Sequence, residues 1–260
     1  MQLVFSDLDG TILDQDNYST EKSSEGISLL KENDIPLILT SAKTRAEMGD
    51  ISAEMNLNSP FIFENGAGID LGRTGFCGDC IMLSPPFEDF RMVFSSLLHN
   101  GYELKAVTDM SIKEMIDMTG LSEKKARLAL MRTGSFPFVV KNEKIFDIDR
   151  TGALNHILSG SGFKIVTGTR FYHLVPVSVD KSAALKRVSE FYKNRVPGEP
   201  VYIFAIGDAA NDIEMLKAAD EAFYVGTGNQ KEFSESITFT SKKGPEGFTE
   251  AVKNIVKVTT

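Results

Sequence analysis

The chain alternates short apolar runs with longer amphipathic stretches, a pattern typical of parallel strands joined by helices. Three apolar runs, at 3–7, 35–41 and 61–63, predict buried strands. Between them, apolar residues recur at helical spacing over about 20–32 and again in a stretch that contains Met48. The N-terminal part therefore predicts a parallel sheet flanked by helices.

The same alternation returns after residue 180. A helical pattern that includes Leu185 leads to an apolar run at 201–206, which predicts another buried strand. A shorter helical pattern, a strand at 223–225 and a last helix containing Phe248 follow. We expect these elements to complete the sheet, so the core is built from two separate segments of the chain.

The middle of the chain follows a different pattern. A helix at 87–98 places phenylalanines on one face, which indicates a core of its own, and strands are expected at 138–140, 163–167 and 170–175. This organisation predicts an α/β cap inserted into the core. The division that follows assigns 1–81 and 173–260 to the catalytic core and 82–172 to the cap.

Composition narrows the class of protein. With 260 residues and 42% apolar content the chain can bury one large core or two small ones. The net charge of -8 argues against nucleic acid as a partner, because phosphate backbones are bound by clustered lysines and arginines. No apolar stretch approaches the roughly 18 residues of a membrane span, and the first residues lead directly into a strand. We expect a cytoplasmic protein without membrane or nucleic-acid partners.

Two carboxylates stand where the first strand ends. Asp7 and Asp9 are one residue apart, so the period of two in a strand would point them the same way, and Gly10 is well suited to end the strand. Open parallel sheets bind ligands at the carboxyl ends of their strands. Such a pair can hold a hard cation, or divide the roles of nucleophile and general acid/base. A plain surface turn is the alternative.

A second acidic group follows the predicted strand at 201–206. It contains Asp208, Asn211 and Asp212, although the last two also suit the N-cap of a helix. Between the two acidic groups, Ser41 ends a strand and Lys181 begins a helical pattern. Acids, a hydroxyl, a lysine and acids are the components of a phosphoryl-transfer site.

These four motifs resemble those of haloacid dehalogenase-type phosphatases, in the same order. The chain is more closely similar to the mannosyl-3-phosphoglycerate phosphatase family in four stretches: Ser41-Ala42-Lys43-Thr44-Arg45, Phe63-Glu64-Asn65-Gly66, Arg170-Phe171-Tyr172-His173 and Gly244-Pro245-Glu246-Gly247-Phe248. The resemblance implies an α/β fold, with a Rossmann-like parallel-sheet core and an inserted α/β cap of type C2B.

The resemblance also implies an activity. It points to a Mg²⁺-dependent phosphatase that hydrolyses mannosyl-3-phosphoglycerate to mannosylglycerate and phosphate. Asp7 is expected to form an aspartyl-phosphate intermediate, and Asp9 to protonate the leaving oxygen and then activate water. Ser41 and Lys181 would bind the phosphate. The expected metal ligands are Asp7, Asp9, Asp208, Asn211 and Asp212, with Asp9 contributing its backbone carbonyl.

The substrate would be a small phosphorylated sugar. Because it carries a carboxylate as well as a phosphate, a second set of polar groups is expected. The candidates are Lys43, Arg45, Asn65, Thr169, Arg170 and Glu246. One cap segment, Arg132-Thr133-Gly134-Ser135-Phe136-Pro137-Phe138, departs from the Arg-Glu-Tyr-x-Glu-Pro-Phe of the family. Glucosyl-3-phosphoglycerate, another sugar phosphate, a phosphomannomutase-like transfer and a non-catalytic sensor are the alternatives.

Overall fold

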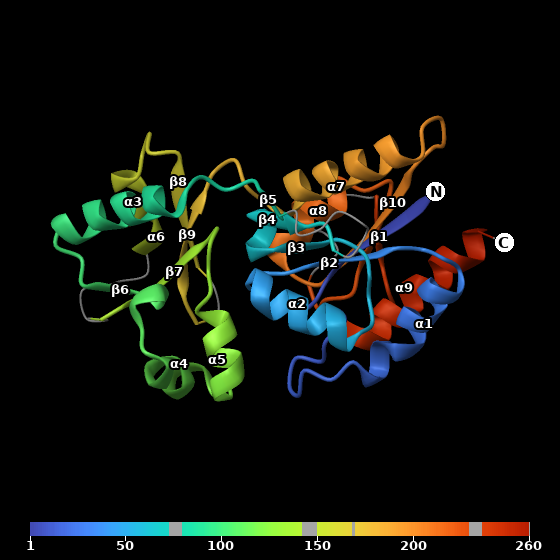
Figure 1. Ribbon diagram of the computed structural model, residues 1–260, viewed down its shortest axis with the longest axis horizontal. Coiled ribbons are helices and arrows are strands. Elements are labelled where there is room, and N and C mark those ends of the chain that lie inside the picture. The colour runs from blue at the N-terminus through green and yellow to red at the C-terminus, as the bar shows by residue number, and fades with distance from the viewer. Residues whose placement is uncertain (73–79, 142–149, 168–169, 229–235, 260) are drawn as a thin grey trace.

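The protein consists of two lobes, and both chain termini lie on the larger one (Figure 1). The computed structural model describes residues 1–72, 80–141, 150–167, 170–228 and 236–259. The larger lobe contains the N- and C-terminal segments, and the smaller lobe contains the middle of the chain. The predicted α/β fold with an inserted cap is confirmed.

The larger lobe, the core, is built on an eight-stranded sheet in the described part of the chain. Its order is β12-β11-β10-β1-β2-β3-β4-β5. The strands from β12 to β3 pair in parallel, and β4 and β5 are antiparallel additions at one edge. Their bounds are β1 (Gln2–Asp7), β2 (Leu37–Thr40), β3 (Phe61–Phe63), β4 (Gly68–Asp70), β5 (Cys80–Met82), β10 (Tyr202–Gly207), β11 (Glu221–Tyr224) and β12 (Ile237–Phe239).

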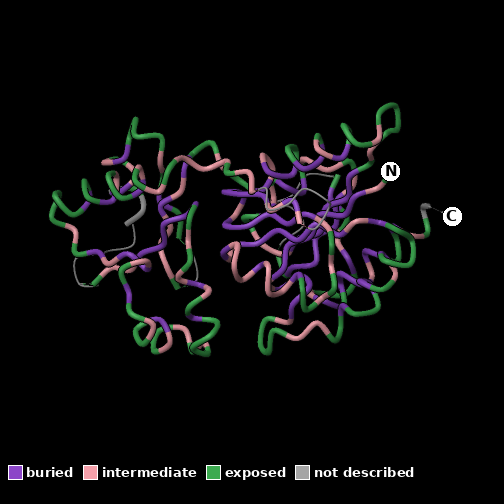
Figure 2. Tube along the Cα trace, viewed as in Figure 1, coloured by how far each residue is buried: buried purple, intermediate pink, exposed green. Residues whose placement is uncertain are grey.

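Helices cover both faces of this sheet. One face packs against α1 (Ser24–Glu32), α2 (Arg45–Glu54) and α9 (Gly244–Thr259), and the other against α7 (Lys181–Arg195) and α8 (Ile213–Lys217). Successive β1 residues alternate between the two cores: Val4 belongs to the first, and Leu3 and Phe5 to the second. Burial on both faces explains why the central parallel strands contain unbroken apolar runs, such as 37–39 in β2 and 203–206 in β10 (Figure 2).

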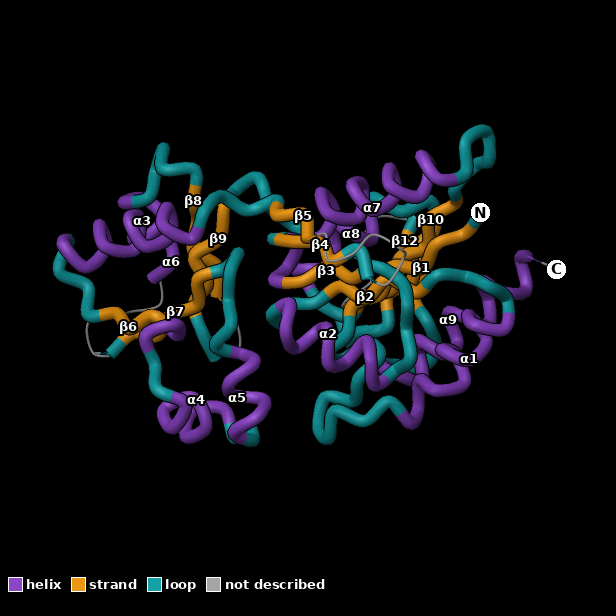
Figure 3. The backbone as a smooth tube through the Cα atoms, viewed as in Figure 1, coloured by secondary structure: helices purple, strands orange, loops and turns teal. Residues whose placement is uncertain are grey.

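The cap has an antiparallel sheet in the order β6-β7-β9-β8 (Figure 3). Its elements are α3 (Phe87–His99), β6 (Leu104–Ala106), α4 (Ile112–Thr119), α5 (Glu123–Ala129), β7 (Phe136–Val140), α6 (Arg150–Ile157), β8 (Phe163–Thr167) and β9 (Tyr172–Pro176). The phenylalanines of α3 form its core, as predicted: the rings of Phe94 and Phe136 lie 4.9 Å apart between centroids.

The boundary between cap and core differs from the predicted one. The division at 172/173 cuts through β9, which pairs with β7 and β8 along its length, so the cap sheet continues to Pro176. Short 3-10 turns lie at Glu21–Ser23, Glu64–Gly66, Val107–Asp109 and Ala210–Asp212. Across the described ranges, we find no helix with both the length and the apolar character that crossing a membrane requires.

Candidate active site

A buried lysine joins two carboxylates at the carboxyl edge of the core sheet. Lys181, the first residue of α7, donates hydrogen bonds from Nζ to Asp7 and to Asp212 Oδ1, the latter at 2.6 Å. Asp7 ends β1, and Asp212 follows β10, the strand that pairs in parallel with β1. The exposed fractions of the three residues are 6% for Asp7, 2% for Lys181 and 0% for Asp212. The sheet thus brings together residues that are distant in the chain.

The acids of this site also form a possible cation site. Asp7, Asp208 and Asp212 each offer a carboxylate oxygen, and these atoms lie within 4.8 Å of one another. The Asp208 side chain accepts a hydrogen bond from Thr11 Oγ1 at 2.8 Å. Gly10, at φ +83°, lies so close that a Cβ atom there would be 2.6 Å from Asp208 Oδ2. A set of oxygen donors fits a hard divalent ion such as Mg²⁺.

Burial and mutual repulsion set the protonation of these groups. Burial raises the pKa of Asp7 well above its usual range, repulsion from Asp212 raises it further, and Lys181 opposes the rise. Burial alone would lower the pKa of Lys181, but the attraction of the two carboxylates outweighs burial and raises it. Burial also raises the pKa of Asp208 to about 6, against the hydrogen bond from Thr11. The ammonium of Lys181 therefore stays charged, and its positive charge favours the ionised forms of Asp7 and Asp208.

Asp9 lies beside this cluster with its own partners. Lys43 Nζ is 2.7 Å from Asp9 Oδ1, and Ser41 Oγ donates to Asp9 Oδ2 at 3.2 Å. The Asp9 side chain is 39% exposed, whereas that of Asp7 is 9% exposed. The two acids thus differ in environment: Asp7 is buried against Lys181, whereas Asp9 is partly exposed beside Lys43.

A cavity of about 1320 Å³ lies between core and cap above these residues. The core lines it with Asp9, Lys43, Asn65 and residues 209–211, and Asn211 Nδ2 lies 3.5 Å from Asn65 Oδ1. The cap contributes basic residues, of which Arg170 was predicted and Lys125 and Arg132 were not. His173 from β9 also lines the cavity. The predicted residues Lys43, Asn65, Arg170 and Asn211 are therefore brought together.

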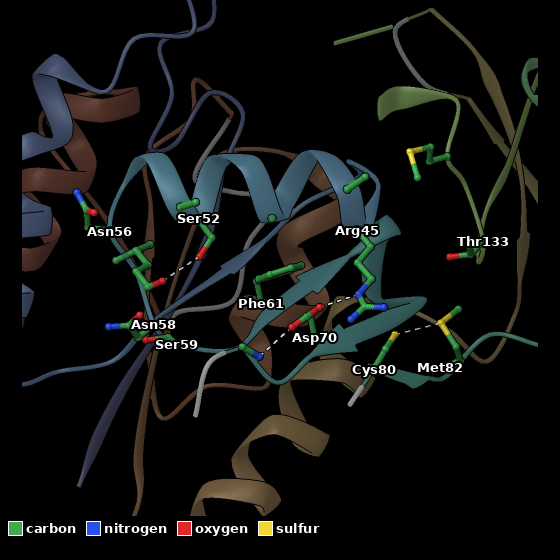
Figure 4. Close-up of a pocket in the computed structure, with 16 residues that line it drawn as sticks. Arg45, Ser52, Asn56, Asn58, Ser59, Phe61, Asp70, Cys80, Met82 and Thr133 are labelled. Carbon is green, nitrogen blue, oxygen red and sulfur yellow. Dashed lines mark hydrogen bonds and ion pairs between the residues drawn. The ribbon is translucent and has the colours of Figure 1, made fainter. Parts of the chain in front are cut away.

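Two predicted substrate residues lie elsewhere, and a third is outside the described residues. Arg45 lines a separate cavity of about 960 Å³, where its Nε pairs with Asp70 Oδ2 at 2.6 Å; the two side chains point toward each other (Figure 4). Glu246 is exposed in the first turn of α9 and does not line the 1320 Å³ cavity among its described residues. Thr169 lies outside the described residues.

Sequence reasoning missed Glu64 and Thr11. Glu64 follows β3 and is 2% exposed, and its carboxylate accepts hydrogen bonds from the cap at Thr133, Gly134 and Ser135. It stands inside the stretch Phe63-Glu64-Asn65-Gly66, which carried the family resemblance, but nothing in the spacing indicates its burial. Thr11 could have been found from the sequence, because it stands directly after Gly10 of the first acidic motif.

Sequence comparison assigns the family. The profile described as haloacid dehalogenase-like hydrolase matches residues 4–75 and 110–251, which include both acidic motifs and Lys181. The chain belongs to this family.

Two relatives match this hydrolase nearly end to end. A protein of Persephonella marina named glucosyl-3-phosphoglycerate/mannosyl-3-phosphoglycerate phosphatase is 31% identical over 267 residues, covering 98% of this chain and 97% of its own. A protein of the same name from Methanococcoides burtonii is 28% identical, again over 98% and 97%. The resemblance to the mannosyl-3-phosphoglycerate phosphatase family is therefore confirmed.

Solved structures support the fold. A Thermoplasma acidophilum protein superimposes with a TM-score of 0.72 at 17% identity and covers 98% of both chains. A sugar phosphatase of HAD subclass IIB has a TM-score of 0.68 at 14% identity, covering 98% of this chain and 99% of its own. These similarities extend over core and cap together, which agrees with the predicted cap type.

Proposed function

We propose that this hydrolase is a Mg²⁺-dependent phosphatase of a sugar-linked phosphoglycerate, with mannosyl-3-phosphoglycerate as the first candidate and glucosyl-3-phosphoglycerate as the second. The observation that carries the proposal is the buried contact of Lys181 with Asp7 and Asp212, with Asp9 next to it at the mouth of the interdomain cavity. The names of the two relatives support this substrate class.

Two residues of the chain carry the proposed reaction: Asp7 forms the bond to phosphorus, and Asp9 transfers the protons. A carboxylate oxygen of Asp7 attacks phosphorus, the bond from phosphorus to the ester oxygen breaks, and Asp9 gives that oxygen a proton. Water then attacks the phosphorus of the aspartyl phosphate while Asp9 takes its proton, which releases phosphate and restores Asp7. Lys181 holds Asp7 in place and supplies positive charge beside the phosphoryl group.

The donor set of Asp7, Asp208 and Asp212 would hold Mg²⁺, with the backbone carbonyl of Asp9 and the side chain of Asn211 as further proposed ligands. A bound divalent cation would neutralise charge on the phosphoryl group and keep the crowded carboxylates ionised. Asp212 Oδ2 already accepts hydrogen bonds from the N–H groups of Asp208 at 3.1 Å and Ala209 at 3.0 Å. This second role keeps the acidic loop in one conformation.

The cavity suits a substrate that is larger than a simple phosphate ester. Its walls carry Lys43 near Asp9 and, on the cap, Arg132 and Arg170. Cationic groups on the cap are placed to receive a carboxylate while the phosphate lies on the core. A substrate with a sugar, a carboxylate and a phosphate would match the size of the cavity, the cationic groups on the cap and the phosphate position on the core.

The test measures phosphate release, with and without Mg²⁺, from mannosyl-3-phosphoglycerate, its glucosyl analogue, 3-phosphoglycerate and hexose phosphates. We expect turnover of the two sugar esters and its abolition in Asp7→Asn. The matched control is Asp109→Asn, which changes an exposed acid of the cap surface. Retention of most activity in Asp7→Asn would refute the role of Asp7 as the nucleophile. Interconversion of hexose 1- and 6-phosphates without phosphate release would show that the protein is a phosphomutase and not a phosphatase.

A further inference from the structure

Glu64 is a buried carboxylate of the core whose observed hydrogen-bond donors belong to the cap. Its Oε1 accepts from the backbone N–H of Thr133 at 3.0 Å. Its Oε2 accepts from the N–H of Gly134 at 3.2 Å and from Ser135 Oγ at 2.6 Å. Hydrogen bonds to an ionised acceptor are stronger than neutral ones, and a buried carboxylate is costly without them. Core and cap are therefore tied together at this point.

The backbone of the cap approaches the core closely beside this carboxylate. A Cβ atom at Gly134 would lie 2.6 Å from Ala67 Cβ and 2.8 Å from Ser84 Oγ. A real Cβ atom essentially never has contacts this short, so a larger residue at this position would require its neighbours to shift. The cap segment at 133–135 is thus docked against the core.

The turn that carries Glu64 is also bound to the site residues next to Asp9. The N–H of Glu64 donates to the carbonyl of Lys43, and the N–H of Asn65 donates to the carbonyl of Ser41, both at 2.9 Å. Glu64 and Asn65 have φ of +50° and +57°, a left-handed conformation that side chains rarely adopt. Conformations of this kind persist only where surrounding contacts hold them.

The same turn touches the helix that carries the catalytic lysine. Gly66, at φ +98°, lies so close to α7 that a Cβ atom would be 2.1 Å from the carbonyl oxygen of Asp180 and 3.0 Å from the backbone nitrogen of Lys181. The turn at 64–66 is therefore held on the core side by contacts with Ser41, Lys43 and the start of α7, none of which involves the cap.

We propose that Glu64 is a positioning residue that clamps the cap onto the core through Thr133, Gly134 and Ser135. A substrate that reaches the cap depends on this clamp, whereas a small phosphate ester that fits on the core does not. The choice of a sugar-linked phosphoglycerate as the larger substrate rests on the proposed function; the clamp itself does not.

The first test compares Glu64→Gln with the wild type on mannosyl-3-phosphoglycerate and on 4-nitrophenyl phosphate. We expect kcat/KM for the sugar ester to fall about tenfold or more, because charge-assisted hydrogen bonds are lost. The value for the small ester should stay within about twofold, since the clamp does not touch the reacting atoms. Glu190→Gln, the same change at an exposed position of α7, is the control and should alter neither. Equal losses on both esters, or no loss, would overturn the proposal.

A second variant approaches the clamp from the cap. Ser135→Ala removes the hydroxyl that donates to Glu64. It should lower kcat/KM for the sugar ester more than kcat/KM for the small ester, and it provides this test even if Glu64→Gln does not fold. In a double-mutant cycle the two changes should be non-additive, because they remove one shared contact. Additive effects would contradict a direct interaction.

X-ray scattering separates the clamp from the proposed function. Without substrate, Glu64→Gln and Ser135→Ala should have a larger radius of gyration than the wild type and Glu190→Gln, because the cap is released. If the wild type cleaves neither sugar ester, the proposed function fails and the scattering result alone decides the clamp. An unchanged radius of gyration in both clamp variants would then overturn it.

Discussion

His173 predicts a specific dependence of stability on pH. It lies on β9, facing the interdomain cavity, and burial followed by repulsion from Arg132 lowers its pKa to about 4 from 6.5. Because the folded pKa is below the unfolded one, the unfolded chain binds more protons between these values. The stability is complete above about pH 6.5 and is lost as the pH falls toward 4. Linkage gives a loss of about 2 kcal/mol at pH 5 relative to pH 7.

The assay is urea unfolding of the wild type and His173→Gln at pH 5, 6, 7 and 8, with a chelator present so that metal binding adds no pH dependence. Other titrating groups are common to both proteins and cancel in the difference. We expect the free energy of unfolding of the wild type to fall by about 2 kcal/mol more than that of the variant between pH 7 and 5. Parallel pH profiles of the two proteins would refute the assignment to His173. A free energy of unfolding that falls less in the wild type than in the variant between pH 7 and 5 would also refute it.

Three further perturbations follow from the site. Lys181→Met leaves two buried carboxylates without their cation, so activity should disappear and metal-free stability should fall by about 3–5 kcal/mol in urea unfolding; an unchanged midpoint would contradict this. Gly66→Ala combines a left-handed φ with a clash against the carbonyl of Asp180, and should lower stability by more than about 1 kcal/mol in thermal unfolding. Lys43→Ala should lower kcat/KM for the sugar ester about tenfold, since Lys43 lines the cavity, whereas Arg45→Ala should change it less than about twofold. A larger loss in Arg45→Ala would place the substrate in the other cavity.

The sheet and its acidic edge could be predicted because they depend on local signals. Uninterrupted apolar runs indicate strands buried on both faces, and parallel pairing brings their carboxyl ends to one edge. Those two rules are enough to bring Asp7 and Asp208 together, and Lys181 followed from the order of the motifs. The strand predicted at 170–175 was counted with the cap pattern, but the division at 172/173 cut through it, because the end of the cap sheet depends on pairing across the chain, which periodicity does not encode.

The substrate residues were harder to predict, because the directions of neighbouring side chains change where a loop leads into a helix. Lys43 precedes the capping residue Thr44 and reaches Asp9, whereas Arg45, the first residue of α2, points to Asp70. Two positions of one motif, separated only by Thr44, thus face different cavities. Glu64 was missed for a related reason, because its burial arises from a left-handed turn and from contacts with the distant cap.

The placement of β1 beside β10 has a consequence for how this protein is made. Gln2 pairs with Tyr202, so the strand that ends at Asp7 emerges from the ribosome long before β10, one of its two neighbours, exists. The cap lies entirely between them in the chain and can collapse on its own phenylalanine core first. Pairings between distant segments form slowly, because the chain between them must be brought together. The hydrolytic centre should therefore be the last part of the newly synthesised molecule to mature, and chains truncated before β10 should leave one side of β1 without its partner and be prone to aggregate.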